Sequence, residues 1–326
     1  MNDDGRRARR VGPGRTRREL LCGLGALGFA AGIAPGLVPG IAPRRAAAAT
    51  GPIRTRAVPA SGEPIPVIGM GSWITFDVGH NPAEKVARIA VLQRFFDAGG
   101  GLIDSSPMYG SSEEVIGYCL GKIADTRGLF AATKVWTLSE AMGIHQMESS
   151  RSLWGVPRFD LMQIHNLLDW QTHIETLVAW KAAGRIRYIG ITTSHGRRHA
   201  AFARLMTELP LDFVQFTYNI LDREAERRLL PLAAERGLAV IVNRPFRRGA
   251  LLDGFEDKPL PDWAVEFDCR NWAQFFLKFI VSHPAVTCAI PATSRVDHMA
   301  ENMGAAYGRL PDPDLRARMV RYVEDL

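Results

Sequence analysis

Cysteine is scarce in this chain of 326 residues, which contains four. Cys22 lies near the N-terminus, and Cys119, Cys269 and Cys288 lack the close spacing that is typical of a metal site. An odd number of thiols after residue 50 does not suggest a framework of paired disulfides. The sequence therefore predicts no metal centre and no disulfide scaffold, and buried structural cysteines are the simpler interpretation.

The chain beyond residue 50 has no excess of either charge. The formal net charge of +6 comes entirely from residues 1–50, which contain nine arginines and three acidic residues. The rest contains 31 basic and 31 acidic side chains. Because binding to a phosphate backbone needs a surplus of cations, we do not expect this part to bind DNA or RNA. A hydrophobic content of 47% and a charged content of 23% are typical of an ordinary globular protein.

A long run without charge occurs only near the N-terminus. Residues 1–19 are rich in arginine, residues 20–43 carry no charge, and four alanines occupy positions 46–49. This order is typical of an export signal, and the string Thr16-Arg17-Arg18-Glu19-Leu20-Leu21 resembles the twin-arginine motif. We expect residues 1–49 to be a cleaved twin-arginine signal peptide. It would engage the twin-arginine export machinery and direct the protein to the periplasm or outside the cell.

An uncleaved membrane anchor is the alternative for this segment, since the uncharged run is long enough to span a bilayer. Its glycines and three prolines argue against a well-packed helix. The run Gly23-Leu24-Gly25-Ala26-Leu27-Gly28 also fits the dinucleotide-binding fingerprint. That motif needs a preceding strand, and here it follows charged residues, so we do not assign nucleotide binding to it.

From residue 51 onwards, short apolar runs alternate with amphipathic stretches. The runs predict eight strands, at Pro66–Met70, Gly101–Asp104, Leu129–Lys134, Phe159–His165, Tyr188–Thr192, Phe213–Phe216, Leu238–Val242 and Val286–Ile290. The predicted helices include Pro82–Ala98, Glu113–Ile123, Trp170–Ala183, His199–Glu208, Arg223–Arg236 and Arg270–His283. Gly99, Gly184 and Gly237 stand where a left-handed residue ends a helix.

Eight such units predict a single-domain α/β protein, a (β/α)₈ TIM barrel over residues 51–326. A hairpin formed by Arg54–Ala60 and Glu63–Ile65 is expected to close the floor of the barrel. A doubly wound open sheet has the same alternation of strand and helix. The even length of the units, and the absence of a glycine cluster after the first strand, favour the barrel.

Three consecutive predicted strands end in reactive side chains, Asp104, Lys134 and His165, and Tyr109 lies five residues after the aspartate. In a barrel these strand ends meet at one mouth. Each residue alone has a structural explanation, but the set suits proton delivery to a carbonyl that is being reduced. The ammonium of Lys134 would lower the high pKa of the Tyr109 phenol, Asp104 would keep Lys134 ionised, and His165 would polarise the substrate oxygen. A cofactor must supply the hydride.

These four residues and their spacing resemble the aldo-keto reductase superfamily. The resemblance covers roughly residues 53–305 and includes Gly69-Met70-Gly71-Ser72-Trp73, the stretch 183–190 and Asp222-Arg223. It implies a (β/α)₈ barrel that binds NADP(H), with NAD(H) as the alternative, and in which Tyr109 donates the proton. The partner is then a small carbonyl or alcohol substrate, and we expect a monomer.

The resemblance also implies where the cofactor binds. The implied residues are, from carboxamide to adenosine phosphate, Thr192, Thr193, Gln215, Asn243, Arg244, Pro245, Phe246, Thr293, Arg295, His298, Glu301 and Asn302. The chain departs from the family pattern at Thr192-Thr193, which replaces Ser-Asn, and at Asn243, which replaces a stacking aromatic. Arg247 and Arg248 would join Arg244 at the pyrophosphate. Trp73 and Trp136 would form an apolar wall for the substrate.

The sequence therefore predicts an exported NAD(P)H-dependent aldo/keto reductase that converts an aldehyde or ketone to an alcohol, or the reverse. One alternative is a regulatory module that holds the nucleotide with little or no turnover, since two cofactor positions depart from the family. Another is a lyase or isomerase that uses Lys134 as a Schiff base, which would leave Tyr109 and Asp104 without a function.

Overall fold

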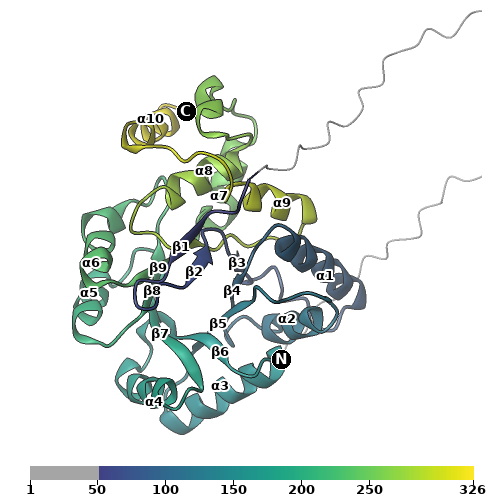
Figure 1. The fold of residues 1–326 in the computed structure, drawn as a ribbon, viewed down its shortest axis with the longest axis vertical. Coiled ribbons are helices and arrows are strands. Elements are labelled where there is room, and N and C mark those ends of the chain that lie inside the picture. The colour runs from purple at the N-terminus through teal and green to yellow at the C-terminus, as the bar shows by residue number, and fades with distance from the viewer. Residues whose placement is uncertain (1–50) are drawn as a thin grey trace, which may run out of the picture. The chain divides into compact units, whose positions relative to one another are not determined.

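The structure is a computed structural model that describes residues 51–326 (Figure 1). The predicted signal peptide, residues 1–49, lies outside the described residues, so its assignment stays a prediction. Among the described residues, no helix is both long enough and apolar enough to cross a membrane.

Eight parallel strands form the centre of the fold and follow one another in sequence order around it. They are β3 (Met70–Gly71), β4 (Leu102–Asp104), β5 (Phe130–Val135), β6 (Phe159–Ile164), β7 (Ile186–Thr192), β8 (Phe213–Thr217), β9 (Ala239–Asn243) and β10 (Cys288–Ala289). Parallel bridges from Ile68 to Ala289 and from Gly71 to Ala292 join the first strand to the last. The (β/α)₈ barrel is therefore confirmed, and each predicted strand overlaps an observed one.

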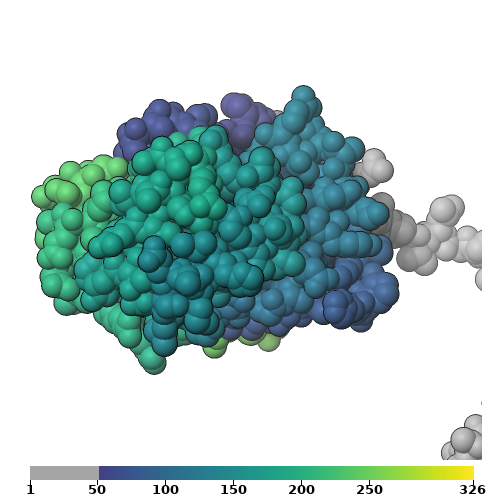
Figure 2. All heavy atoms as spheres, turned by 90° about the horizontal axis from the view of Figure 1, so that it is seen from below, coloured from purple at the N-terminus to yellow at the C-terminus, as the bar shows by residue number. Residues whose placement is uncertain are grey.

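Helices surround the strands (Figure 1). They are α1 (Pro82–Asp97), α2 (Ser112–Leu120), α3 (Glu140–Trp154), α4 (Trp170–Ala182), α5 (His199–Glu208), α6 (Leu229–Arg236), α7 (Ala250–Phe255), α8 (Trp272–Val281), α9 (Val296–Gly304) and α10 (Pro313–Glu324). Figure 2 shows the side on which the teal segment with α3 and α4 covers the barrel. Gly99, Gly184 and Gly237 all have positive φ after their helices, as predicted.

The predicted helix Arg223–Arg236 is wrong as a single element. The structure has a short 3-10 turn, η2 (Glu224–Arg227), followed by α6 from Leu229. Arg228 between them has φ −141°, outside the helical region. The cause is Pro231, which lacks an N–H and whose ring would clash with the carbonyl four residues earlier, so it is tolerated only in the first turn of a helix.

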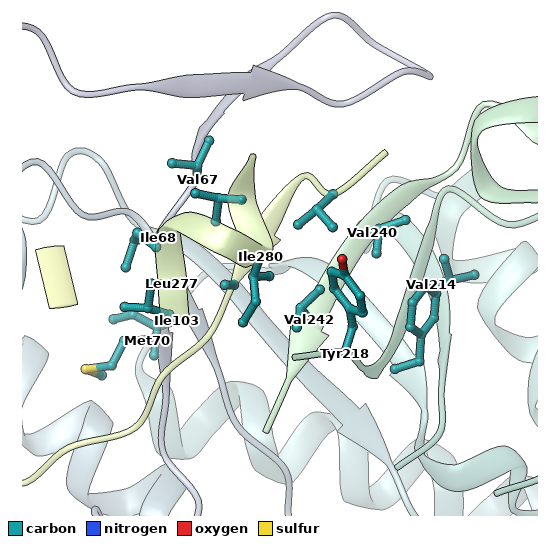
Figure 3. Close-up of a cluster of buried hydrophobic side chains, with 14 of the residues drawn as sticks. Val67, Ile68, Met70, Ile103, Val214, Tyr218, Val240, Val242, Leu277 and Ile280 are labelled. Atoms are coloured by element: carbon teal, nitrogen blue, oxygen red, sulfur yellow. The ribbon is translucent and has the colours of Figure 1, made fainter. Parts of the chain in front are cut away.

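Two layers of buried apolar side chains hold the barrel together. Inside it, Leu102, Leu161 and Phe213 belong to one cluster. Residues that point the other way along the same strands pack against the helices, because successive side chains of a strand face opposite sides. Figure 3 shows this outer layer, with Val242 of β9 beside Ile280 of α8. The three described cysteines are free and buried, as predicted.

The predicted hairpin is also confirmed. Strands β1 (Thr55–Ala57) and β2 (Pro64–Pro66) pair antiparallel, and Ile65 belongs to the buried cluster inside the barrel. The Arg56 guanidinium donates to the carbonyls of His283 at 2.7 Å and Pro284 at 2.6 Å, just after α8. The hairpin therefore closes the end of the barrel at which the strands begin.

A buried lysine secures the C-terminal segment to α8. The Lys278 side chain donates to the carbonyls of Phe267 and Tyr307, each at 2.8 Å, and of Arg309 at 3.0 Å. Burial lowers the pKa of Lys278 to about 8. Each carbonyl left without a donor in a buried position costs roughly 1–3 kcal/mol, so this one side chain holds two other segments, at Phe267 and at 307–309, against α8.

We predict that Lys278→Met lowers the free energy of unfolding by about 3 kcal/mol, because the buried carbonyls lose their donor. Urea denaturation followed by circular dichroism measures this loss. Lys258→Met is the matched control: Lys258 is exposed and bonds to a single carbonyl, that of Leu326, so it should change the free energy of unfolding by less than about 0.5 kcal/mol. Equal effects of the two substitutions would contradict this role.

Candidate active site

The strand ends β4 and β5 bring an ion pair into the barrel mouth. Lys134 Nζ lies 2.5 Å from Asp104 Oδ2 and 2.6 Å from the carbonyl oxygen of Ser105. The two side chains are 0% and 3% exposed. Such a pair is expensive to bury unless hydrogen bonds satisfy the remaining polar atoms. Two of the four predicted catalytic residues are therefore in direct contact.

Two glutamines complete the surroundings of the carboxylate. Asp104 Oδ1 accepts from Gln163 Nε2 at 2.9 Å and from Gln215 Nε2 at 3.0 Å. Gln163 was not predicted from the sequence, although it lies near the end of β6, two residues before His165, which follows the strand and was predicted to end it. Side chains two apart on a strand share a face, so the position of the histidine was the signal that Gln163 also faces the interior.

Tyr109, in the loop after β4, lies over the ammonium. Lys134 Nζ is 5.2 Å from the centre of its ring. Burial raises the pKa of Tyr109, and the charge of Lys134 offsets part of this rise. The lysine thus acts in the predicted direction, but the predicted net lowering of the Tyr109 pKa is wrong, because the effect of burial is larger. Burial also lowers the pKa of Lys134, but the interactions with Asp104 and Tyr109 together more than reverse this, so the pKa is raised.

His165 follows β6 and faces Tyr109, with the two rings edge to face and their centres 5.7 Å apart. Its Nδ1 lies 2.8 Å from the hydroxyl oxygen of Ser106. Burial and the nearby positive charge of Lys134 lower the pKa of His165 to about 3. The imidazole is therefore neutral at physiological pH. Asp104, Lys134, Tyr109 and His165 form one connected site, as the sequence suggested.

Of the two tryptophans predicted to form the substrate wall, one is covered by another side chain and the other is exposed to solvent. Trp73, after β3, carries the Arg248 guanidinium over its ring, 4.0 Å from the centre. Trp136, after β5, is 40% exposed, and its backbone is held by Gln146. Arg248, for which the sequence suggested a role at the pyrophosphate, lies against Trp73 in this structure, and its role at the cofactor stays a prediction.

The residues predicted to contact the carboxamide of the nicotinamide form hydrogen bonds with one another and with neighbouring loops. The Thr192 hydroxyl accepts from the N–H of Asn166 at 3.0 Å, and the Thr193 hydroxyl donates to the carbonyl of Arg197 at 2.9 Å. Asn243 Nδ2 donates to the carbonyl of Thr193 at 2.9 Å and to Gln215 Oε1 at 3.4 Å. A chain of hydrogen bonds thus runs from Asn243 through Gln215 to the catalytic carboxylate.

A cavity of about 600 Å³ lies beside this chain, between the loops after β7, β8 and β9. Thr217, Arg244 and Arg247 line it, whereas the four catalytic residues do not. Arg244 Nη1 is buried, and no described residue accepts from it. A guanidinium nitrogen in this state suits an anionic oxygen, so Arg244 fits the phosphate-binding role that the sequence assigned to it. Pro245 and Phe246, which follow it, are buried.

The predicted adenosine segment follows β10 and includes α9. Thr293 and Asn302 are buried, whereas Arg295, His298 and Glu301 are at least partly exposed. The hydroxyl oxygen of Thr293 accepts from the N–H of Arg295 at 3.1 Å. The Arg295 guanidinium bonds to Asp297. This ion pair is exposed to solvent, and pairs of this kind are weak, so a phosphate group can compete for the arginine.

Comparison with known proteins places this site in a family. Residues 67–317 match the model of the aldo/keto reductase family. The chain belongs to this family. As the sequence predicted, the protein is an NAD(P)-dependent oxidoreductase that acts on a carbonyl group.

Individual relatives of the reductase are distant. An uncharacterized oxidoreductase of Schizosaccharomyces pombe is 29% identical over 258 residues, which is 74% of this chain and 78% of the relative. An NADH-specific methylglyoxal reductase of Escherichia coli is 29% identical over 224 residues, 56% of this chain and 64% of the relative. A solved aldo/keto reductase of Klebsiella pneumoniae in complex with NADP and acetate superposes with a TM-score of 0.68 at 24% identity. The superposition covers 80% of this chain and 93% of the Klebsiella pneumoniae chain.

We predict that the turnover number of the reductase does not change around pH 6.5, the ordinary pKa of histidine. With its pKa lowered to about 3, His165 stays neutral between pH 5.5 and 8. Measuring kcat at saturating cofactor and substrate over this range tests the prediction, and a titration near pH 6.5 that His165→Asn removes would contradict it.

The lowered pKa of His165 also affects stability. Since the imidazole takes up its second proton at a higher pH in the unfolded chain than in the folded protein, His165 lowers the free energy of unfolding as the pH falls below 6.5.

Proposed function

We propose that the reductase converts an aldehyde or ketone to an alcohol with NADPH, and that Tyr109 donates the proton to the carbonyl oxygen. The observation that carries this proposal is the buried contact between Asp104 and Lys134, with the Lys134 ammonium against the ring of a buried phenol, Tyr109. When bound, the nicotinamide supplies the hydride, which no side chain can donate.

Each of the four residues has a distinct part in this proposal. As the proton leaves Tyr109, negative charge develops on its oxygen, and the ammonium of Lys134 stabilises that charge. Asp104 keeps the ammonium in place and in its charged form. His165, being neutral, donates a hydrogen bond to the substrate oxygen without competing for the proton. The group of residues therefore delivers one proton to one oxygen.

The proposed cofactor residues are Arg244 for a phosphate group and Arg295 for the adenosine phosphate. Arg244 Nη1 is buried beside a cavity and has no acceptor among residues 51–326. The preference for NADPH is supported by the Klebsiella pneumoniae relative, which was solved with NADP, while the Escherichia coli relative is specific for NADH. A titration of both nucleotides against the free protein, followed by fluorescence, tests this preference directly.

We predict that Tyr109→Phe lowers kcat for carbonyl reduction by roughly 10²- to 10⁴-fold, the usual contribution of a positioned general acid. The oxidation of NADPH with a panel of small aldehydes and ketones, followed by its absorbance, measures this loss. The dissociation constants of NADPH and NADH should stay within about twofold, because only one hydroxyl is removed.

Tyr118→Phe is the matched control, because Tyr118 lies on the surface of α2 and should leave kcat unchanged. Undiminished turnover in Tyr109→Phe would remove the assigned acid. Tight nucleotide binding without turnover of any carbonyl by the unaltered protein would instead favour the regulatory module.

We also propose that residues 1–49 direct the folded reductase to the periplasm or outside the cell. The support is the order of arginines, uncharged residues and alanines, with the pair Arg17-Arg18 before Leu20-Leu21. Export of a folded protein suits an enzyme that takes up its nicotinamide cofactor before it leaves the cytoplasm.

We predict that replacing both Arg17 and Arg18 by lysine retains the protein in the cytoplasm of a host with twin-arginine export. Cell fractionation and mass spectrometry of the N-terminus measure the outcome, with cleavage expected near Ala49. The same change at Arg44 and Arg45, a second arginine pair outside the motif, is the matched control and should leave export intact. A protein that stays on the membrane with residues 1–49 attached would establish the anchor instead.

A further inference from the structure

Ser106 contacts one of the two ring nitrogens of His165, Nδ1. The serine lies in the loop after β4, two residues after Asp104, and is 0% exposed. Its hydroxyl oxygen is 2.8 Å from His165 Nδ1. No residue from 51 to 326 bonds to the other nitrogen, Nε2. The imidazole is thus bonded to the protein at one end alone.

The donor in this contact follows from the bonds that the serine makes. Its oxygen also accepts the backbone N–H of Met108 at 3.3 Å. If Nδ1 donated a proton as well, the hydroxyl oxygen would accept twice and its own proton would need a third partner. No acceptor other than Nδ1 is available to it in the described part of the chain. A buried donor without a partner is costly, so Ser106 donates and Nδ1 accepts.

We propose that Ser106 is a positioning residue that holds His165 in the tautomer with its proton on Nε2. A neutral imidazole has one N–H and one lone pair, so a lone pair at Nδ1 places the N–H at Nε2. That N–H can donate to a carbonyl oxygen, whereas the other tautomer would present a lone pair and repel it. The hydrogen bond from Nε2 to a carbonyl substrate rests on the proposed function. The assignment of the tautomer does not, because it follows from the contact with Ser106.

The surroundings of the histidine are consistent with this arrangement. Its ring packs edge to face against Tyr109, and Lys134 and Asp104 are the charged groups nearby. The Lys134 ammonium opposes a second proton on the imidazole. The Asp104 oxygens are bonded to Lys134, Gln163 and Gln215, and none of them bonds to the ring. The position of the single proton is thus left to Ser106.

Nitrogen NMR of the protein labelled with ¹⁵N-histidine tests the tautomer in the free reductase. The chain has eight histidines, and the spectrum of His165→Asn assigns the signals of His165. We expect a protonated Nε2 and an unprotonated Nδ1, unchanged between pH 5.5 and 8. In Ser106→Ala the two signals should move towards averaged values, and in Ser106→Thr, which keeps the hydroxyl, they should stay as in the unaltered protein.

Turnover provides the second measurement. Ser106→Ala should lower kcat about fivefold to tenfold, the loss expected for one net hydrogen bond, with the dissociation constant of NADPH unchanged, and Ser106→Thr should restore it. Ser112→Ala is the matched control: Ser112 is equally buried, and its hydroxyl donates to the carbonyl of Ser72. It should change neither the spectrum nor kcat.

A proton on Nδ1 in the unaltered protein would overturn the proposal, and so would signals of His165 that are identical in Ser106→Ala. A loss of kcat without a change of tautomer would also overturn it, since the serine would then act through packing alone. Because the spectra require no substrate, they decide the tautomer even if no carbonyl is turned over, a result that would contradict the proposed function instead.

Discussion

The active site depends on the buried ion pair between Asp104 and Lys134. Both side chains are withdrawn from water, and the ammonium also bonds to a backbone carbonyl. Removing one partner of such a pair costs about 3–5 kcal/mol, because the other charge stays buried and unpaired. Every further group in the site is arranged around this pair: two glutamines bond to the carboxylate, and a phenol and an imidazole lie near the ammonium.

Burial shifts the pKa values of Tyr109, His165 and Lys134, and the resulting protonation states suit the donation of a proton to an oxygen. It raises the pKa of the Tyr109 phenol, which is protonated near neutral pH even at its ordinary pKa, and lowers the pKa of His165, which keeps the imidazole neutral. Lys134 remains charged because its interactions with Asp104 and Tyr109 together outweigh its burial. Near neutral pH the site thus holds two neutral hydrogen-bond donors beside one fixed cation. This combination suits an oxygen that accepts a proton while negative charge develops next to it.

The parts of the site that sequence reasoning found are those with distinctive chemistry at the ends of strands. Asp104, Lys134 and His165 could be predicted to meet because parallel strands in a barrel end at one mouth. Gln163 and Ser106 were missed, since amides and hydroxyls occur throughout any protein and neither residue ends a strand. The break before α6 was missed too, although Pro231 was there to indicate it. The placement of Arg248 over Trp73 depends on a loop whose path no local pattern specifies.

The sequence by itself determined the alternation of strands and helices, the glycines that end the helices, and which reactive side chains lie at the mouth. These features follow from local periodicity and from covalent chemistry, which need no knowledge of neighbours. The tertiary structure alone decided the balance of pKa values at Tyr109, the donors to Asp104 and the partner of His165 Nδ1. Burial and hydrogen-bond geometry are properties of residues that are far apart in the chain and adjacent only after folding.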